Sequence, residues 1–316
     1  MRIYYTTDLH GSEKCWRKFL ATPKYYEADV IIVGGDITGK FIVPIVRRPG
    51  GRAEATFMGR KRRLRKEQDI HALKQRISDA GQYPVDMTRE EYRDYSENPS
   101  QVDALFKKLL VQRVREWVAL ADERLRGQNV RCLVSAGNDD IFEVDEVLAQ
   151  SETIEMHDSC VVDLEEGYQI FGLSYSNMTP WKCPRDISEE ELSARIDELA
   201  RQVEDMERAI FDIHAPPYAS GLDEAPELKE DMSYVLDGTG QPKMIPVGSK
   251  AVRDAILKYQ PLVGLHGHIH EAAGIRKMGR TTLVNPGSEY AEGILRGAVI
   301  ELDAQRGLTS VNLVAG

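Results

Sequence analysis

Two potential metal ligands, Asp8 and His10, stand one residue apart near the start of the chain. They come directly after the β-rich stretch 2–7, so both are expected to project from the loop that follows the first strand. One carboxylate and one imidazole suit a borderline divalent metal such as manganese, iron or zinc. An Asp-x-His triplet is common in unrelated proteins, however, so by itself it specifies no function.

Four further polar motifs follow along the chain, each directly after an apolar stretch. They are Gly34-Gly35-Asp36, Gly137-Asn138, His214 and Gly267-His268-Ile269-His270. A turn or a helix cap would explain any one of these residues, but not seven potential ligands in this order. Asp36 stands in a glycine-flanked turn, from which its carboxylate can bridge two cations about 3.5–4 Å apart.

In their order, these motifs resemble the calcineurin-like metallophosphoesterase family, whose core reads Asp-x-His, Gly-Asp, Gly-Asn, a single His and Gly-His-x-His. The resemblance runs from Asp8 to Ser288 and leaves out only the region 40–127. It implies that one metal is held by Asp8, His10 and His270, that the other is held by Asn138, His214 and His268, and that Asp36 bridges both. It further implies a metal-dependent hydrolase, a phosphodiesterase or a phosphatase, in which a hydroxide that bridges two manganese, iron or zinc ions attacks phosphorus.

One position departs from the family pattern. Where many relatives have His after Gly-Asn, this chain has Asp139. An ionised Asp repels a phosphate, so Asp139 would act as an acid only if burial or a shared hydrogen bond kept it protonated. The expected catalytic residues are therefore Asn138, Asp139 and His266, although His266 is equally compatible with a structural histidine under the loop.

Five apolar stretches are expected to form buried strands that end in these motifs: 2–7, 29–33, 130–135, 209–213 and 262–265. Ligands bind at the carboxyl ends of strands in open α/β sheets, so the motifs should meet at one rim. Alternating segments within 154–175 and 274–313 indicate a second sheet. Helices are expected over 12–20, 101–126 and 188–208. These elements predict an α/β fold, a four-layer αββα sandwich of two mixed sheets flanked by helices.

The stretch 40–127 has a composition of its own. It carries 20 Lys and Arg against 13 Asp and Glu, although the whole chain of 316 residues has a formal charge of −10. Its basic peak is 60–66. Because it separates two strands that end in site motifs, we interpret it as a largely helical, cap-like insertion in a single domain that spans 1–316. Its charges are interpreted first as a solvated helix face, and the alternative is a cap that attracts a phosphate-bearing substrate.

The composition limits the possible partners and location. The net charge of −10 opposes overall attraction to nucleic acid or to an anionic membrane. There is no apolar run long enough to cross a bilayer and no secretory leader, so a cytoplasmic protein is expected. The four cysteines form no Cys-x-x-Cys pair and are expected to be reduced. A homo-oligomer, with the insertion as a contact, stays open.

Three functions remain open from the residues and the resemblance. We favour hydrolysis of a small phosphodiester or phosphomonoester, because the acidic remainder of the chain opposes a long polyanion. A nuclease that binds nucleic acid through the basic insertion is the first alternative. A non-catalytic interaction scaffold is the second, and it is disfavoured because every ligand position is filled.

Overall fold

A first six-stranded sheet is built around the strand at the start of the chain. The structure is a computed structural model that describes residues 1–316. The strand order is β20-β19-β1-β2-β7-β8. The strands are β1 (Arg2–Thr6), β2 (Val30–Gly34), β7 (Arg131–Ser135), β8 (Ile154–Met156), β19 (Arg296–Asp303) and β20 (Gly307–Ala315). The first four are parallel, and β19 and β20 are antiparallel additions at one edge.

A second six-stranded sheet packs against the first, in the order β17-β18-β16-β13-β10-β9. Its strands are β9 (Val161–Asp163), β10 (Gln169–Leu173), β13 (Ala209–Ile213), β16 (Val263–Leu265), β17 (Gly274–Met278) and β18 (Thr281–Asn285). The four central strands are parallel and the two edge strands are antiparallel. Both sheets are therefore mixed, as expected from the sequence.

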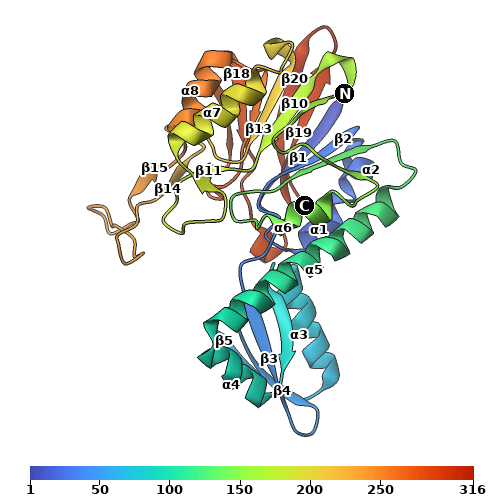
Figure 1. The fold of residues 1–316 in the computed structure, drawn as a ribbon, viewed down its shortest axis with the longest axis vertical. Coiled ribbons are helices and arrows are strands. Elements are labelled where there is room, and N and C mark those ends of the chain that lie inside the picture. The colour runs from blue at the N-terminus through green and yellow to red at the C-terminus, as the bar shows by residue number, and fades with distance from the viewer.

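Alternating side chains explain why each sheet is buried on both faces. In β1, Ile3 and Tyr5 belong to the core between the sheets, whereas Tyr4 belongs to the core under the helices. Helices α1 (Glu13–Phe19), α2 (Thr22–Tyr26), α5 (Pro99–Leu125) and α6 (Glu143–Leu148) cover the first sheet, while α7 (Glu189–Ala200) and α8 (Lys250–Tyr259) cover the second (Figure 1). The predicted four-layer αββα sandwich is confirmed.

The distribution of strands between the sheets differs from the expectation. Strands β8 and β19 join the first sheet, and β13 and β16 lie in the second. An alternating or apolar pattern identifies a strand, but the partner sheet depends on long-range pairing that the pattern does not contain. Helix α7 also ends at Ala200, eight residues earlier than expected, and a 3-10 turn (Met206–Arg208) follows it.

The insertion contains a four-stranded sheet that was not predicted from the sequence. Its order is β5-β4-β3-β6. The elements are β3 (Ile42–Arg48), β4 (Arg52–Phe57), β5 (Arg60–Leu64), α3 (Glu67–Asp79), β6 (Tyr83–Met87) and α4 (Arg89–Glu97), followed by α5. Most of the basic peak at 60–66 is thus the strand β5 and not a helix face. In β5, four consecutive cations conceal the alternation of polar and apolar residues that would indicate a strand. In β4, the buried residues include alanines, which are weak indicators of a strand.

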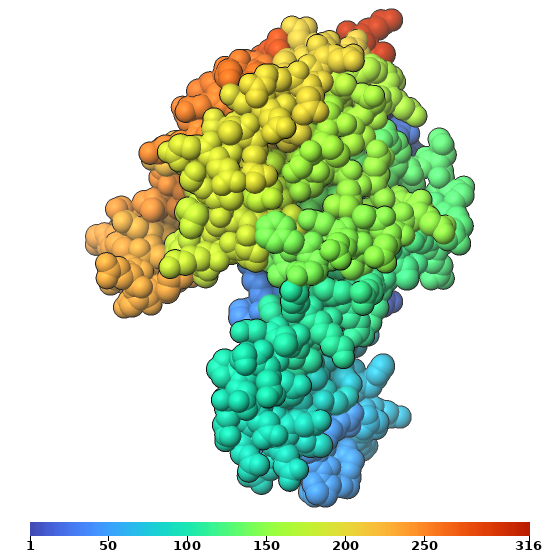
Figure 2. All heavy atoms as spheres, in the orientation of Figure 1, coloured from blue at the N-terminus to red at the C-terminus, as the bar shows by residue number.

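The insertion forms a lobe that projects from the two-sheet body (Figure 2). It has its own apolar core, which includes Ile45, Phe57 and Leu73. Helix α5 runs from this lobe onto the first sheet, where the Trp117 ring stacks on Trp16 with centroids 4.7 Å apart. A second projection is formed by the antiparallel pair of β14 (Glu224–Pro226) and β15 (Met244–Pro246). Elsewhere, β11 (Ser176–Asn177) pairs with β12 (Asp186–Ile187).

None of the helices combines the length and the apolar character that a transmembrane span requires.

Candidate metal centre

Loops at the carboxyl ends of five parallel strands carry all seven predicted ligands. Strand β1 precedes Asp8 and His10, β2 precedes Asp36, and β7 precedes Asn138 in the first sheet. In the second sheet, β13 precedes His214 and β16 precedes His268 and His270. Parallel strands place such loops along one edge of a sheet. Two stacked sheets therefore bring two rows of polar loops together.

The backbone of this rim is strained. Four predicted ligands have positive φ values: Asp8 (54°), His10 (42°), Asp36 (48°) and His268 (67°). These values lie in the left-handed region, which residues other than glycine rarely adopt. Each such residue costs about 1–3 kcal/mol unless the surroundings hold it, and such strain gathers at functional sites. Four of the predicted ligands are held in this way.

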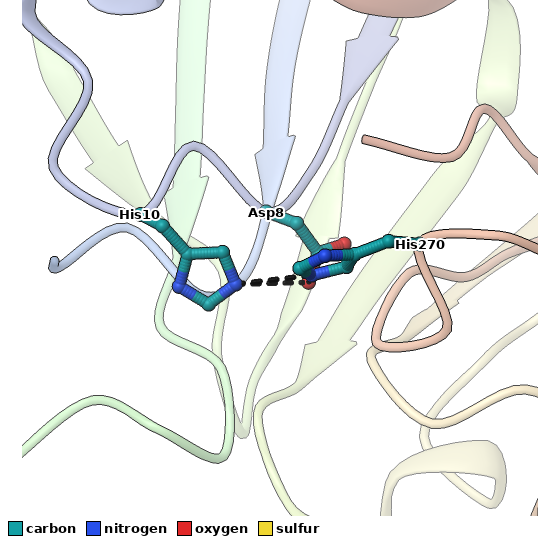
Figure 3. Close-up of side chains that lie close together, drawn as sticks. All are labelled: Asp8, His10 and His270. Atoms are coloured by element: carbon teal, nitrogen blue, oxygen red, sulfur yellow. Dashed lines mark hydrogen bonds and ion pairs between the residues drawn. The ribbon is translucent and has the colours of Figure 1, made fainter. Parts of the chain in front are cut away.

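Asp8, His10 and His270 form the first cluster (Figure 3). The Nε2 atom of His270 lies 3.2 Å from Oδ1 of Asp8 and 3.1 Å from Nε2 of His10. Nδ1 of His10 lies 3.2 Å from the carbonyl oxygen of Thr38, so this nitrogen is the donor and Nε2 keeps its lone pair. A hydrogen bond of this kind fixes the tautomer in which an imidazole binds metal.

Asp36, His214 and His268 form the second cluster. Nδ1 of His214 donates to the carbonyl oxygen of Gly34 at 2.9 Å, and its Nε2 lies 3.4 Å from Oδ2 of Asp36. The same Oδ2 atom lies 3.6 Å from Nε2 of His10 in the first cluster. Asp36 therefore lies between the two clusters, which is the position a bridging carboxylate requires.

Two of the predicted ligands each have a buried polar atom with no hydrogen-bond partner in the protein. Asn138 donates from Nδ2 to Oδ1 of Asp186 at 2.9 Å, and this bond leaves its Oδ1 atom buried and unpaired. Nε2 of His214 is also buried and without a hydrogen bond. Unsatisfied buried polar atoms cost free energy that a bound cation would remove. The carboxylate, imidazole and amide atoms of the rim thus fit divalent metal ions.

The clusters are electrostatically coupled. Burial opposes a charge on His214, but the carboxylates of Asp36 and Asp8 outweigh burial and raise the pKa of His214 to about 10. Burial also opposes ionisation of Asp8, yet His270 and His214 hold the pKa of Asp8 below its usual range. Protons on imidazoles thus balance the carboxylates in the metal-free protein, so metal and protons compete for these side chains.

Asp140 ties two metal-site loops together. Its carboxylate accepts hydrogen bonds from the N–H groups of Ile37, Thr38 and Gly137 at 2.8–2.9 Å, and from the Thr38 hydroxyl. Burial is the largest influence on Asp140, and it raises the pKa of this carboxyl to about 6. The loop after β2 is thereby fixed to the loop after β7. Asp140 was missed from the sequence, although it lies two residues after Asn138.

Asp139 lies beside the clusters, but its contacts are those of an acceptor. Its carboxylate has an oxygen within 4.8 Å of ligand atoms of His10 and Asp36. Oδ2 lies 2.7 Å from Nζ of Lys40, and Oδ1 accepts from Sγ of Cys183 at 2.8 Å. This arrangement suits a carboxylate that positions Lys40 better than it suits a proton donor. Lys40 and Cys183 were both missed from the sequence, because nothing in their own segments marks them.

His266 lies under the rim. Its Nδ1 atom is 2.8 Å from the carbonyl oxygen of Ile213, and its Nε2 atom packs against Gly264 inside β16. The clusters of potential ligands do not include it. This position fits the structural alternative. His157 is fully buried, and its Nε2 atom lies 2.6 Å from Oδ2 of Asp212. A single polar residue between short strands did not indicate this pair.

A cavity of about 500 Å³ adjoins the first cluster. It is lined by His270, Ser288, Glu289, Tyr290 and Arg296, among others. The ring of Tyr290 also lies against His10, with centroids 4.7 Å apart. The cavity therefore opens beside a predicted ligand, and Glu271 and Glu292 also line it.

Comparisons with known proteins support the fold. No protein-family model matches the chain. The uncharacterized protein MJ1162 of Methanocaldococcus jannaschii is 29% identical over 143 residues, which are 45% of this chain and 58% of that protein. The crystal structure of TT1561 of Thermus thermophilus is similar at a TM-score of 0.51 and 14% identity, over 100% of this chain and 97% of that one. A dimetal phosphatase of Danio rerio gives a TM-score of 0.44 at 8% identity, over 100% and 98% of the two chains.

The chain therefore covers somewhat more than half the length of its curated relative, and the likeness to solved structures concerns the fold alone. The two mixed sheets, with the predicted ligands in loops at one rim, are consistent with the calcineurin-like metallophosphoesterase fold that the motifs predict. The resemblance drawn from the motifs is confirmed at this level.

Proposed function

We propose that this protein is a metal-dependent phosphoesterase that hydrolyses a small phosphodiester or phosphomonoester. The observation that carries the proposal is the meeting of two clusters of ligands at Asp36, where His10 and His214 approach the same carboxylate oxygen at 3.6 and 3.4 Å. A pair of cations needs a shared anion of this kind.

The proposed division of ligands follows the two clusters. Asp8, His10 and His270 would hold one ion, and Asn138, His214 and His268 the other. Such ions activate water and neutralise charge on a phosphoryl group. The protein contributes preorganisation, because Thr38 and Gly34 fix the imidazoles of His10 and His214 before any metal arrives.

The substrate is proposed to be small. The body outside the insertion is strongly acidic, and the cavity beside His270 has a volume of about 500 Å³, within the range of small-molecule sites. A nucleic acid would need the insertion, whose basic strand β5 lies at the edge of a separate sheet. A non-catalytic scaffold is disfavoured, since a scaffold gains nothing from four strained ligand residues.

The test is a panel of mono-, di- and cyclic phosphate esters assayed with manganese, iron or zinc. We expect hydrolysis of at least one ester, and loss of about 10³-fold or more in Asp36→Asn, because both ions lose their shared anion. Asp103→Asn, which changes an exposed carboxylate of α5, is the matched control. Unchanged turnover in Asp36→Asn, or no hydrolysis with any metal, would refute the proposal.

A further inference from the structure

Lys40 places an ammonium group at the rim of the metal centre. It is the first residue of the insertion and stands four residues after Asp36. Its Nζ atom lies 2.7 Å from Oδ2 of Asp139, and an oxygen of the same carboxylate lies within 4.8 Å of ligand atoms of His10 and Asp36. The Lys40 side chain is 37% exposed. A group bound at the clusters can therefore meet this cation from the open side.

The backbone that leads to Lys40 is fixed by the insertion. The N–H group of Gly39 donates to the Tyr83 hydroxyl at 2.8 Å, and a Cβ atom on Gly39 would overlap the carbonyl oxygen of Gly81. Arg113 of α5 lies over the Tyr83 ring, 5.2 Å from its centroid, and donates to the carbonyl oxygen of Gly11 at 2.6 Å. These contacts tie Lys40 to both the lobe and the first metal-site loop.

Asp139 positions the Lys40 ammonium without using all of its N–H donors. An ammonium has three N–H groups, and Asp139 is the one carboxylate in ion-pair contact with Lys40. Asp139 also accepts from the Cys183 thiol, so its negative charge is shared between two donors. Burial opposes the charge of Lys40, but Asp139 and Asp36 outweigh burial and raise its pKa, so the side chain is a cation at any neutral pH.

We propose, building on the phosphoesterase function above, that Lys40 is a phosphate-binding residue whose Nζ donates to a non-bridging phosphoryl oxygen, and that Asp139 is its positioning residue. A lysine is a compact point charge suited to such an oxygen. The insertion thus completes the site by presenting Lys40.

The test uses the full-length, metal-loaded protein and inorganic phosphate as the probe. Lys40→Met removes the charge and nearly keeps the length, and Lys40→Arg keeps the charge. Calorimetric titration should show phosphate binding about 10- to 100-fold weaker in Lys40→Met, as expected for a lost hydrogen bond to a charged group, and within about threefold of wild type in Lys40→Arg. Metal content and melting temperature should be unchanged in both variants.

Asp139→Asn tests the positioning role. It should weaken phosphate binding in the wild-type background and have no further effect in the Lys40→Met background, because its effect acts through Lys40. Additive losses in this cycle would overturn the positioning role.

Wild-type phosphate affinity in folded, metal-loaded Lys40→Met, or no phosphate binding by the wild type, would overturn the role of Lys40. Failure of the proposed function is seen separately, as absence of ester hydrolysis by the wild type.

Discussion

At the scale of single residues, the candidate site contains strained backbone conformations and buried polar atoms without hydrogen bonds, which the fold alone does not require. Asp8, His10, Asp36 and His268 adopt left-handed backbone conformations, and Asn138 Oδ1 is buried without a partner. A protein that only needed a stable rim would avoid both features. Their occurrence in predicted ligands around the Asp36 carboxylate supports the interpretation of these residues as metal ligands.

Metal affinity should depend on pH. In the metal-free protein His214 keeps its proton up to a pKa of about 10, and an imidazole must lose its proton to bind metal. Apparent affinity should therefore rise with pH across the neutral range, and loading at neutral pH should release about one proton per chain from His214. Calorimetry in two buffers of different ionisation enthalpy measures this release. Identical binding heats in both buffers would contradict the assignment of His214 as a ligand.

Asp186 is expected to orient the proposed ligand Asn138, although no sequence motif includes Asp186. Oδ1 of Asp186 accepts from Nδ2 of Asn138 and so turns the Asn138 oxygen toward the site. Asp186→Ala should weaken binding of the metal near Asn138 by about 10- to 100-fold, the usual effect of removing a residue that orients a ligand. Metal competition with a chromophoric chelator is the measurement, with Asp103→Ala as control. Equal affinity in the two variants would show that Asn138 needs no such orientation.

At the scale of elements, glycines allow the loops to approach each other. Gly35 has a φ of 115°, and a Cβ atom on it would overlap the ring of His214. Gly59 also has a positive φ, of 68°, but nothing lies within 4 Å of where its Cβ would be. Gly35→Ala should lower the free energy of unfolding by more than Gly59→Ala, which bears only the conformational cost of about 1 kcal/mol. Chemical denaturation compares the two. Equal losses would indicate that the loop after β2 can shift to accommodate the added Cβ atom at no further cost in free energy.

The motif-bearing strands could be predicted because each combines an apolar run with a polar loop. The structure places β1, β2, β7, β13 and β16 within about one residue of the expected bounds. Membership of a sheet could not be predicted, because the apolar pattern does not say that β19 pairs with β1 at the other end of the chain, whereas β8 pairs with the preceding strand β7. The contacts of Lys40 and Cys183 with Asp139 were out of reach for the same reason: they join three separate loops.

At the scale of the whole molecule, a basic lobe is attached to an acidic body with the candidate metal centre. If substrates are small, the basic strand β5 should not contribute to turnover. Replacing Lys61 and Arg63 of this strand and the adjacent Arg65 by Gln should leave kcat/KM for a small ester within about twofold, since exposed charges rarely contribute much energy. Steady-state assays at low and high salt measure this. A large, salt-sensitive loss would favour a polyanionic substrate.

The most direct measurement is anomalous X-ray scattering from crystals of the protein loaded with manganese. We expect two anomalous peaks about 3.5–4 Å apart, on either side of the Asp36 carboxylate, one next to Asp8 and His270 and one next to His214 and His268. A single peak, peaks remote from Asp36, or no peak at saturating metal would contradict a dinuclear centre.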